Sequence, residues 1–150
     1  MQRTLSRQPV VVARRPGFTL IEILVVLAVI AVLAALVAPN VFQRLGQAKS
    51  DATRAQIEML GAALDAYRLD NGRYPTTDQG LEALWREPDI EPLPRNWRGP
   101  YLRRAVPLDP WGNEYHYRFP GEHGQFDIWS NGADGQPGGE GENRKIGNWQ

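Results

Sequence analysis

Apolar and polar residues divide the first half of the chain into two helical segments of different character. The first, residues 18–38, is a run of 21 residues in which Glu22 is the only charged side chain. An α-helix of this length spans about 30 Å, which is the thickness of the hydrocarbon core of a bilayer. The run is also longer than the roughly 7–15 apolar residues of a secretory signal peptide. The pattern therefore predicts a membrane-spanning helix that begins at Phe18.

The second helical segment, from Val41 to about Asp70, has an apolar stripe on one face only. Spacings of three or four residues place four apolar side chains together: Ile57, Leu60, Leu64 and Tyr67. Asn71 and Gly72 follow directly and predict the end of the helix. Pro39, between the two segments, removes a backbone donor and predicts a kink. The stripe needs a cover from the rest of the chain.

Short elements are expected beyond Gly72, where most prolines and glycines and all five tryptophans lie. Residues 76–85 predict a short helix capped by Thr76, Thr77 or Asp78, and a proline-rich loop follows at 87–100. Alternating or aromatic-rich runs between turn residues predict three strands, at residues 101–104, 114–119 and 126–129. A small antiparallel sheet on the second helical segment would cover the stripe, which makes the fold class α+β. We expect the tryptophans to anchor core and loops.

Charge is distributed unevenly although the net charge is zero. Residues 1–17 carry four arginines and no acidic residue, whereas the rest of the chain carries 13 basic and 17 acidic side chains. The body therefore lacks the basic surface of a nucleic-acid-binding protein. Arginines directly before an apolar helix keep that end in the cytoplasm, so the body would lie in the periplasm. Cleavage by a signal peptidase after Ala38 is an alternative, although Pro39 is a poor context for that cut.

Glu22 needs an explanation because an ionised carboxylate inside a bilayer costs about 2.5–3.5 kcal/mol or more. A tolerated polar residue near the helix end is one interpretation. The other is a cationic partner, and no lysine or arginine lies between Phe18 and Arg44. Cleavage between Gly17 and Phe18 would create an α-amine four residues before Glu22. Pairing with the amine of a neighbouring subunit would fix the axial register of a non-closing stack of helices, which is a filament.

A glycine-rich segment, residues 130–149, brings Asp134, Glu140 and Glu142 within nine residues of one another. Tight turns and hard oxygen donors suit calcium, but a solvated acidic loop explains the composition as well. The chain has no cysteine and no helical histidine pair, so we expect neither His116 nor His123 to bind a metal or to catalyse.

The stretch "RRPGFTLIEILVVLAVIAVL" resembles the processing site and N-terminal helix of type IV pilins and their relatives. The resemblance implies that a prepilin peptidase cuts after Gly17 and that Phe18 becomes N-methylated. Glu22 matches the glutamate at the fifth position of the mature family members. The implied fold is a long helix, embedded in the membrane over its first half, packed against a small antiparallel sheet.

Motifs in the C-terminal half narrow the resemblance to one group within this family. The stretches "RYPTTDQGLEALW", "DPWGNEYHYRFPGEHGQFDIWSNGADG" and "IGNW" are similar to the major pseudopilins of type II secretion systems, the G-type core pseudopilins. Many other type IV pilins close their C-terminal loop with a disulfide, and this chain has no cysteine. The resemblance implies a helical homopolymer, assembled from inner-membrane subunits, that drives folded proteins out through the outer membrane. The implied partners are the prepilin peptidase, minor pseudopilins, an inner-membrane assembly platform and, before assembly, membrane lipid.

The same resemblance implies a structural calcium ion in the glycine-rich segment. Asp134 matches a side-chain ligand, and Asn131 lies where a backbone carbonyl ligand is found. The family usually has an aspartate just before "IGNW", where this chain has Arg144 and Lys145. These two cations would have to point away from the site, and the missing oxygens would have to come from Glu140, Glu142 or Asn143.

Three regions follow: a leader at residues 1–17 that is removed, a membrane and filament-core helix at 18–38, and a periplasmic domain at 39–150. The favoured function is a structural filament subunit without enzymatic activity. Two alternatives stay open at this point. One is a signal-anchored periplasmic binding module that never polymerises, and the other is a type IV pilin used for adhesion or motility.

Overall fold

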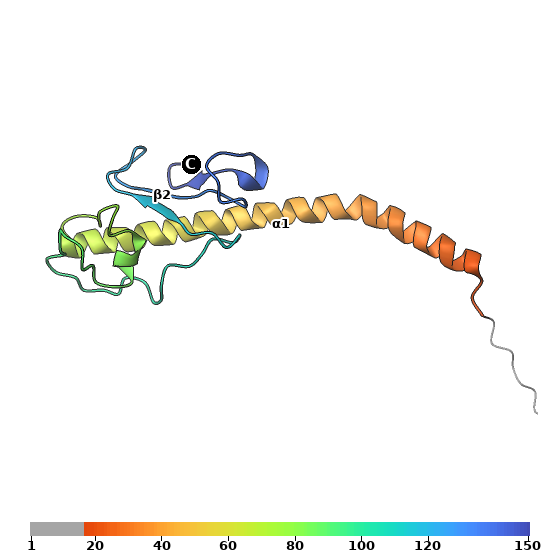
Figure 1. Cartoon of the computed structure of the whole chain (residues 1–150), viewed down its shortest axis with the longest axis horizontal. Coiled ribbons are helices and arrows are strands. Elements are labelled where there is room, and N and C mark those ends of the chain that lie inside the picture. Colours follow the sequence, from red (N-terminus) through yellow and green to blue (C-terminus); the bar gives the residue numbers. More distant parts are fainter. Residues whose placement is uncertain (1–16) are drawn as a thin grey trace, which may run out of the picture. The chain divides into compact units, whose positions relative to one another are not determined.

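A single helix, α1 (Leu20–Asn71), makes up more than a third of the chain (Figure 1). The computed structural model describes residues 17–150, without the side chains of residues 38–40. The chain forms two compact units, Met1–Asn40 and Val41–Gln150, and α1 contributes a segment to each. The leader expected at residues 1–17 lies outside the described residues except for Gly17. The kink expected at Pro39 stays a prediction.

The end of α1 is where the sequence predicts it. Gly72 adopts φ 77°, a left-handed conformation that favours glycine, and its N–H donates to the carbonyl of Arg68 at 2.7 Å. The side-chain amide of Asn71 donates to the carbonyl of Tyr67 at 3.0 Å, so two carbonyls of the last turns have partners. Helix start differs slightly from expectation, since α1 begins at Leu20 and not at Phe18.

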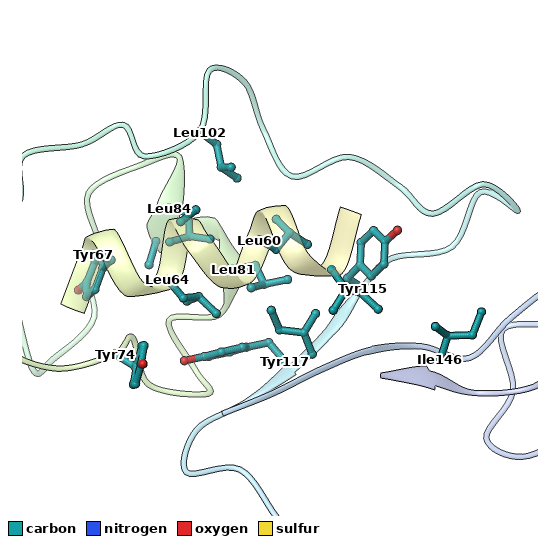
Figure 2. Packing of buried hydrophobic residues seen from close by; sticks show 14 residues of the cluster. Leu60, Leu64, Tyr67, Tyr74, Leu81, Leu84, Leu102, Tyr115, Tyr117 and Ile146 are labelled. Carbon is teal, nitrogen blue, oxygen red and sulfur yellow. The ribbon is translucent and has the colours of Figure 1, made fainter. Parts of the chain in front are cut away.

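The predicted stripe on the second half of α1 is the centre of the core. Its four side chains, Ile57, Leu60, Leu64 and Tyr67, are at most 2% exposed. Figure 2 shows Leu60, Leu64 and Tyr67 among side chains from later in the chain, such as Leu81, Leu84 and Tyr117. Burial of each large apolar side chain contributes roughly 1.5–3 kcal/mol, so this stripe is what holds the short C-terminal elements on the helix.

The sheet has three short antiparallel strands in the order β1-β2-β3, and it confirms the predicted architecture. Strands β1 (His116–Arg118) and β2 (Asp127–Ser130) form a hairpin in which Tyr117 pairs with Ile128. Strand β1 lies within the strand predicted at residues 114–119 and is shorter, and β2 overlaps the strand predicted at 126–129 but is shifted by one residue. Strand β3 (Ile146–Gly147) pairs with β2 and was not predicted, because two residues carry no periodic pattern.

The strand predicted at residues 101–104 is wrong. The backbone N–H groups of Tyr101 and Leu102 both donate to the carbonyl of Leu84, at 2.8 and 3.1 Å, and join no strand. The segment therefore covers a short helix and does not extend the sheet. The aromatic and apolar side chains that suggested a strand serve this packing, since Leu102 is 9% exposed.

The helix predicted at residues 76–85 is a turn followed by a single 3₁₀ turn, η1 (Leu81–Leu84). Thr76 and Gln79 exchange side-chain-to-backbone hydrogen bonds at 3.0 and 3.2 Å and close the turn before η1. Thr76, one of the three expected caps, therefore caps this turn, whereas Gly80 precedes η1 itself with φ 61° and no side-chain cap. The tryptophans act partly as expected, since Trp97 packs on the core and donates from Nε1 to the carbonyl of Ala83 at 3.1 Å.

Candidate functional site

The expected processing site lies in an open, non-helical segment before α1. Gly17 would have nothing within 4 Å of an added Cβ, and the Phe18 side chain is 80% exposed. The peptide bond between these residues is therefore accessible to a protease as far as the described residues show. Cleavage itself is not visible in the chain and stays a prediction.

Glu22 has a local role that sequence reasoning missed. The Thr19 hydroxyl oxygen accepts the N–H of Glu22 at 3.2 Å, and Glu22 Oε2 accepts the N–H of Thr19 at 3.4 Å. This reciprocal pair is a capping box, which satisfies two of the orphan donors at a helix start. The sequence signal was present, because a threonine three residues before a glutamate at an apolar run is the pattern of this motif.

The apolar segment of α1 presents its side chains on the surface. Every described side chain between Phe18 and Val37 is exposed, and mean hydropathy reaches 3.2 over an 18-residue window. By length and composition the helix can cross a membrane. Such a surface is unstable in water, so lipid or other apolar helices must cover it.

The second candidate site is the glycine-rich segment, which closes on itself. The N–H of Ala133 donates to the carbonyl of Glu142 at 2.9 Å, and the side-chain amide of Asn113 donates to the carbonyl of Gly132 at 2.8 Å. Gly132 adopts φ 82°, and an added Cβ would meet the Glu142 carbonyl oxygen at 2.4 Å. Only glycine permits this close approach of two backbone segments.

The three carboxylates of this segment do not gather in one place. Asp134 is exposed, and its Oδ1 accepts the N–H of Gln136 at 3.0 Å. The Glu142 carboxylate lies against α1 beside Gly46 and accepts from Trp111 Nε1 at 3.4 Å. Within residues 17–150, the one group of three or more acidic or imidazole ligands found together does not include them. The Glu142 carboxylate therefore contacts α1 and Trp111 and is not grouped with Asp134 as a calcium ligand.

Asn131 offers an oxygen that lacks a partner. Its amide nitrogen lies 3.2 Å from the carbonyl of Gly135 and 3.0 Å from Nε2 of His116, while its Oδ1 is buried without a hydrogen bond. A buried acceptor left unsatisfied costs about 1–3 kcal/mol. The sequence resemblance implied the backbone carbonyl oxygen of Asn131 as a calcium ligand, and the structure adds its side-chain oxygen as a second candidate ligand.

Arg144 and Lys145 stand where the family usually has an acidic residue, and the calcium hypothesis requires both to point away from the site. Lys145 meets this requirement. Lys145 Nζ is 4.9 Å from the centroid of the Trp129 ring, a cation–π contact that occupies its charge. Arg144 lines a hollow with Glu142, Gln43 and Gly46. The oxygen donors of Asp134 and Asn131 fit a calcium ion by their chemistry, whereas the carboxylate of Glu142 does not face them.

Comparison with known families gives two matches that together cover almost the whole chain. Residues 40–149 match the family "Type II secretion system (T2SS), protein G". Residues 13–38 match the "Prokaryotic N-terminal methylation motif", which includes Gly17, Phe18 and Glu22.

Individual proteins show the same similarity over most of their length. Type II secretion system core protein G of Pseudomonas aeruginosa is 49% identical over 136 residues, which covers 91% of this chain and 96% of that protein. The corresponding Vibrio cholerae protein is 49% identical over 137 residues, covering 91% and 92%. The crystal structure of the major pseudopilin from the type 2 secretion system of enterohaemorrhagic Escherichia coli matches with a TM-score of 0.64. That match has 45% identity and covers 71% of this chain and 87% of the other.

Proposed function

The chain belongs to the type II secretion system protein G family, and on this premise we propose that it works as the major structural subunit of a periplasmic pseudopilus. Subunits leave the inner membrane, stack into a helical homopolymer and drive the export of folded proteins through the outer membrane. The family is one of structural subunits. The alternatives of an adhesive or motility pilin and of a non-polymerising binding module are set aside, because the relatives are secretion proteins.

The observation that carries this function is the uncovered apolar helix with one acidic residue near its start. Its large apolar side chains between Phe18 and Val37 are 46–80% exposed. Lipid covers this surface while the subunit is in the membrane, and the same segment of other copies covers it in the filament. A contact of this kind between identical chains is heterologous and does not close, so it grows into a fibre.

Processing prepares the chain for assembly. A prepilin peptidase cuts between Gly17 and Phe18, and Phe18 is then N-methylated; the match to the methylation motif and the open backbone at Gly17 support this step. The cut gives Phe18 a cationic α-amine. Glu22 of one subunit pairs with that amine on a neighbouring subunit and fixes the axial register of the stack.

Location and partners follow from this arrangement. The leader stays in the cytoplasm, α1 crosses the inner membrane once, and the C-terminal domain lies in the periplasm; the arginine-rich residues 1–17 support this orientation. The subunit interacts with the prepilin peptidase, minor pseudopilins and an inner-membrane assembly platform. Energy comes from a separate cytoplasmic ATPase.

Intact mass and N-terminal sequencing of the chain purified from its own membranes test the processing step. The expected product begins at Phe18 and carries one additional methyl group. A product that begins at Pro39, or that retains Met1, would refute filament assembly by this route.

The role of Glu22 in assembly is tested with two variants that separate its charge from its capping box. Glu22→Gln keeps an N3 residue that completes the box but removes the negative charge, whereas Glu22→Ala removes both. We expect both variants to lose filaments and secretion while the periplasmic domain still folds. If Glu22→Gln assembles normally and only Glu22→Ala fails, the residue acts as a helix cap and the pairing with an amine is wrong.

We also propose that the glycine-rich segment holds a structural calcium ion. Asp134 and Asn131 are the main ligands, and Glu140, Asn143 or a shift of Glu142 would complete the oxygen set. The buried, unpartnered Asn131 Oδ1 supports this. A chelator should lower the melting temperature of a fragment comprising residues 43–150, and calcium should restore it. Asp134→Asn should abolish the response, whereas Asp89→Asn, at an exposed position in the proline-rich loop, should leave it intact. An unchanged melting temperature on chelation would refute the proposal.

A further inference from the structure

A second group of ligand atoms lies at the tip of the β1–β2 hairpin, away from the glycine-rich segment. Glu122, His123 and Asp127 each place one ligand atom within 4.8 Å of the others. They are separated by at most five positions in the sequence, but the closing of the hairpin is what turns them toward one another. The function proposed above does not use these side chains.

Asp127 is the most firmly held residue of this group. It is 2% exposed. It begins β2 directly after the loop and pairs with Arg118, the last residue of β1 before the loop. Its carboxylate accepts the backbone N–H of Glu122 at 2.9 Å and that of His123 at 3.2 Å. These two hydrogen bonds hold the carboxylate in one orientation.

His123 is held in position from a different direction. Its ring stacks on Trp149, with centroids 4.1 Å apart and an angle of 8° between the planes. In this orientation Nδ1 lies 3.0 Å from Asp127 Oδ2. The indole thus limits the rotation of an otherwise exposed imidazole and directs one particular nitrogen at the carboxylate.

We propose that Glu122, His123 and Asp127 form a binding site for a divalent transition-metal ion, with Zn²⁺ as the ion. One imidazole nitrogen and two carboxylate oxygens are ligands that zinc accepts, whereas calcium and magnesium take oxygen donors almost alone. Two ligands of a tetrahedral zinc ion with bonds of about 2.0–2.1 Å are about 3.3 Å apart. The separation of His123 Nδ1 from Asp127 Oδ2 is already close to that value, so an ion can replace their hydrogen bond with little movement.

Glu122 is the adjustable ligand. It is exposed and forms an ion pair with Arg118, which therefore competes with a metal ion for the carboxylate. Rotation of this side chain toward Asp127 completes three protein ligands, and water takes the fourth position. The site is of the open type, and its ion would tie the hairpin tip to the C-terminal end of the chain through the His123–Trp149 stack.

The test uses zinc titration by calorimetry on the full chain in detergent micelles, with calcium in excess so that the glycine-rich segment is saturated. The decisive variant is His123→Phe, which keeps a ring on Trp149 but removes the nitrogen ligand. The matched control is His116→Phe, because His116 is the other histidine and also stacks on a tryptophan, Trp129, at 5.2 Å and 19°.

We expect one zinc ion per chain, at least about tenfold weaker binding in His123→Phe, and unchanged binding in His116→Phe. Loss of an outer partner of a metal ligand already costs about 10–100-fold in affinity, so loss of a ligand should cost no less. Arg118→Ala should strengthen binding, because it frees Glu122. Equal affinity in wild type and His123→Phe, or no zinc binding by the wild type at 100-fold molar excess of zinc, overturns the proposal.

Discussion

Gly132 offers a direct test of how the glycine-rich segment is held together. Its φ of 82° lies in the left-handed region, and an added Cβ would lie 2.4 Å from the carbonyl oxygen of Glu142 and 2.8 Å from the carbonyl carbon of Asn143. Both of these are backbone atoms, which cannot rotate away as a side chain could. Gly132→Ala should therefore push the backbone around residue 132 away from the backbone of residues 142–143.

A second glycine separates the cost of conformation from the cost of the clash. Gly72 has a similar φ of 77°, but an added Cβ there would meet nothing within 4 Å. A non-glycine residue in the left-handed region costs about 1–2 kcal/mol, and this applies to both alanine variants. Overpacking against fixed atoms adds about 1–3 kcal/mol. We therefore expect Gly132→Ala to lower the free energy of unfolding by about 2–5 kcal/mol and Gly72→Ala by about 1–2 kcal/mol.

Urea denaturation of a fragment comprising residues 43–150 measures both values. This fragment contains the 14 buried core residues found in the described part of the chain, from Ile57 to Ile146. The melting temperature should also respond less to chelation in Gly132→Ala, since the loop that holds Asp134 is displaced. Equal destabilisation by the two variants would show that the close approach at Gly132 does not exist in solution.

Two further predictions concern the core. Leu64→Ala, at a side chain with no exposed surface, should lower the free energy of unfolding by about 2.7–5 kcal/mol, whereas Leu69→Ala on the same helix, 86% exposed, should change it by no more than about 0.5 kcal/mol; similar losses would contradict the assigned face. Tyr117 is buried and donates to the carbonyl of Pro75 at 2.8 Å, and burial, followed by the nearby Tyr74, raises its pKa. The stability that the neutral, buried Tyr117 contributes is fully present below the pKa of an unfolded tyrosine, about 10, and is lost as the pH rises above it. In urea denaturation at a series of pH values, wild type should therefore lose stability more steeply than Tyr117→Phe above that pH.

Prediction from the sequence worked where a pattern repeats over several turns. The stripe from Ile57 to Tyr67 and the stop at Gly72 were located because helical spacing and a left-handed glycine leave clear signals. It failed at residues 101–104 and for β3, where the segments are too short for periodicity to separate a strand from a loop. Packing on η1, which no local pattern reports, decided the conformation of Tyr101 and Leu102.

The sequence by itself determined the membrane-compatible helix and the resemblance to a family, and tertiary structure decided the state of the candidate sites. The apolar run after Phe18 and the isolated charge of Glu22 are read along the chain, and the motifs they form carried the resemblance to filament subunits. Composition alone could not show that Glu142 turns to α1 or that Asn131 keeps an unpartnered oxygen. Nor did it indicate that His123 faces the Asp127 carboxylate, because the direction of this imidazole is set by the Trp149 ring, 26 positions later in the sequence. Such arrangements depend on which backbone segments meet, and that is fixed only when the sheet closes over the helix.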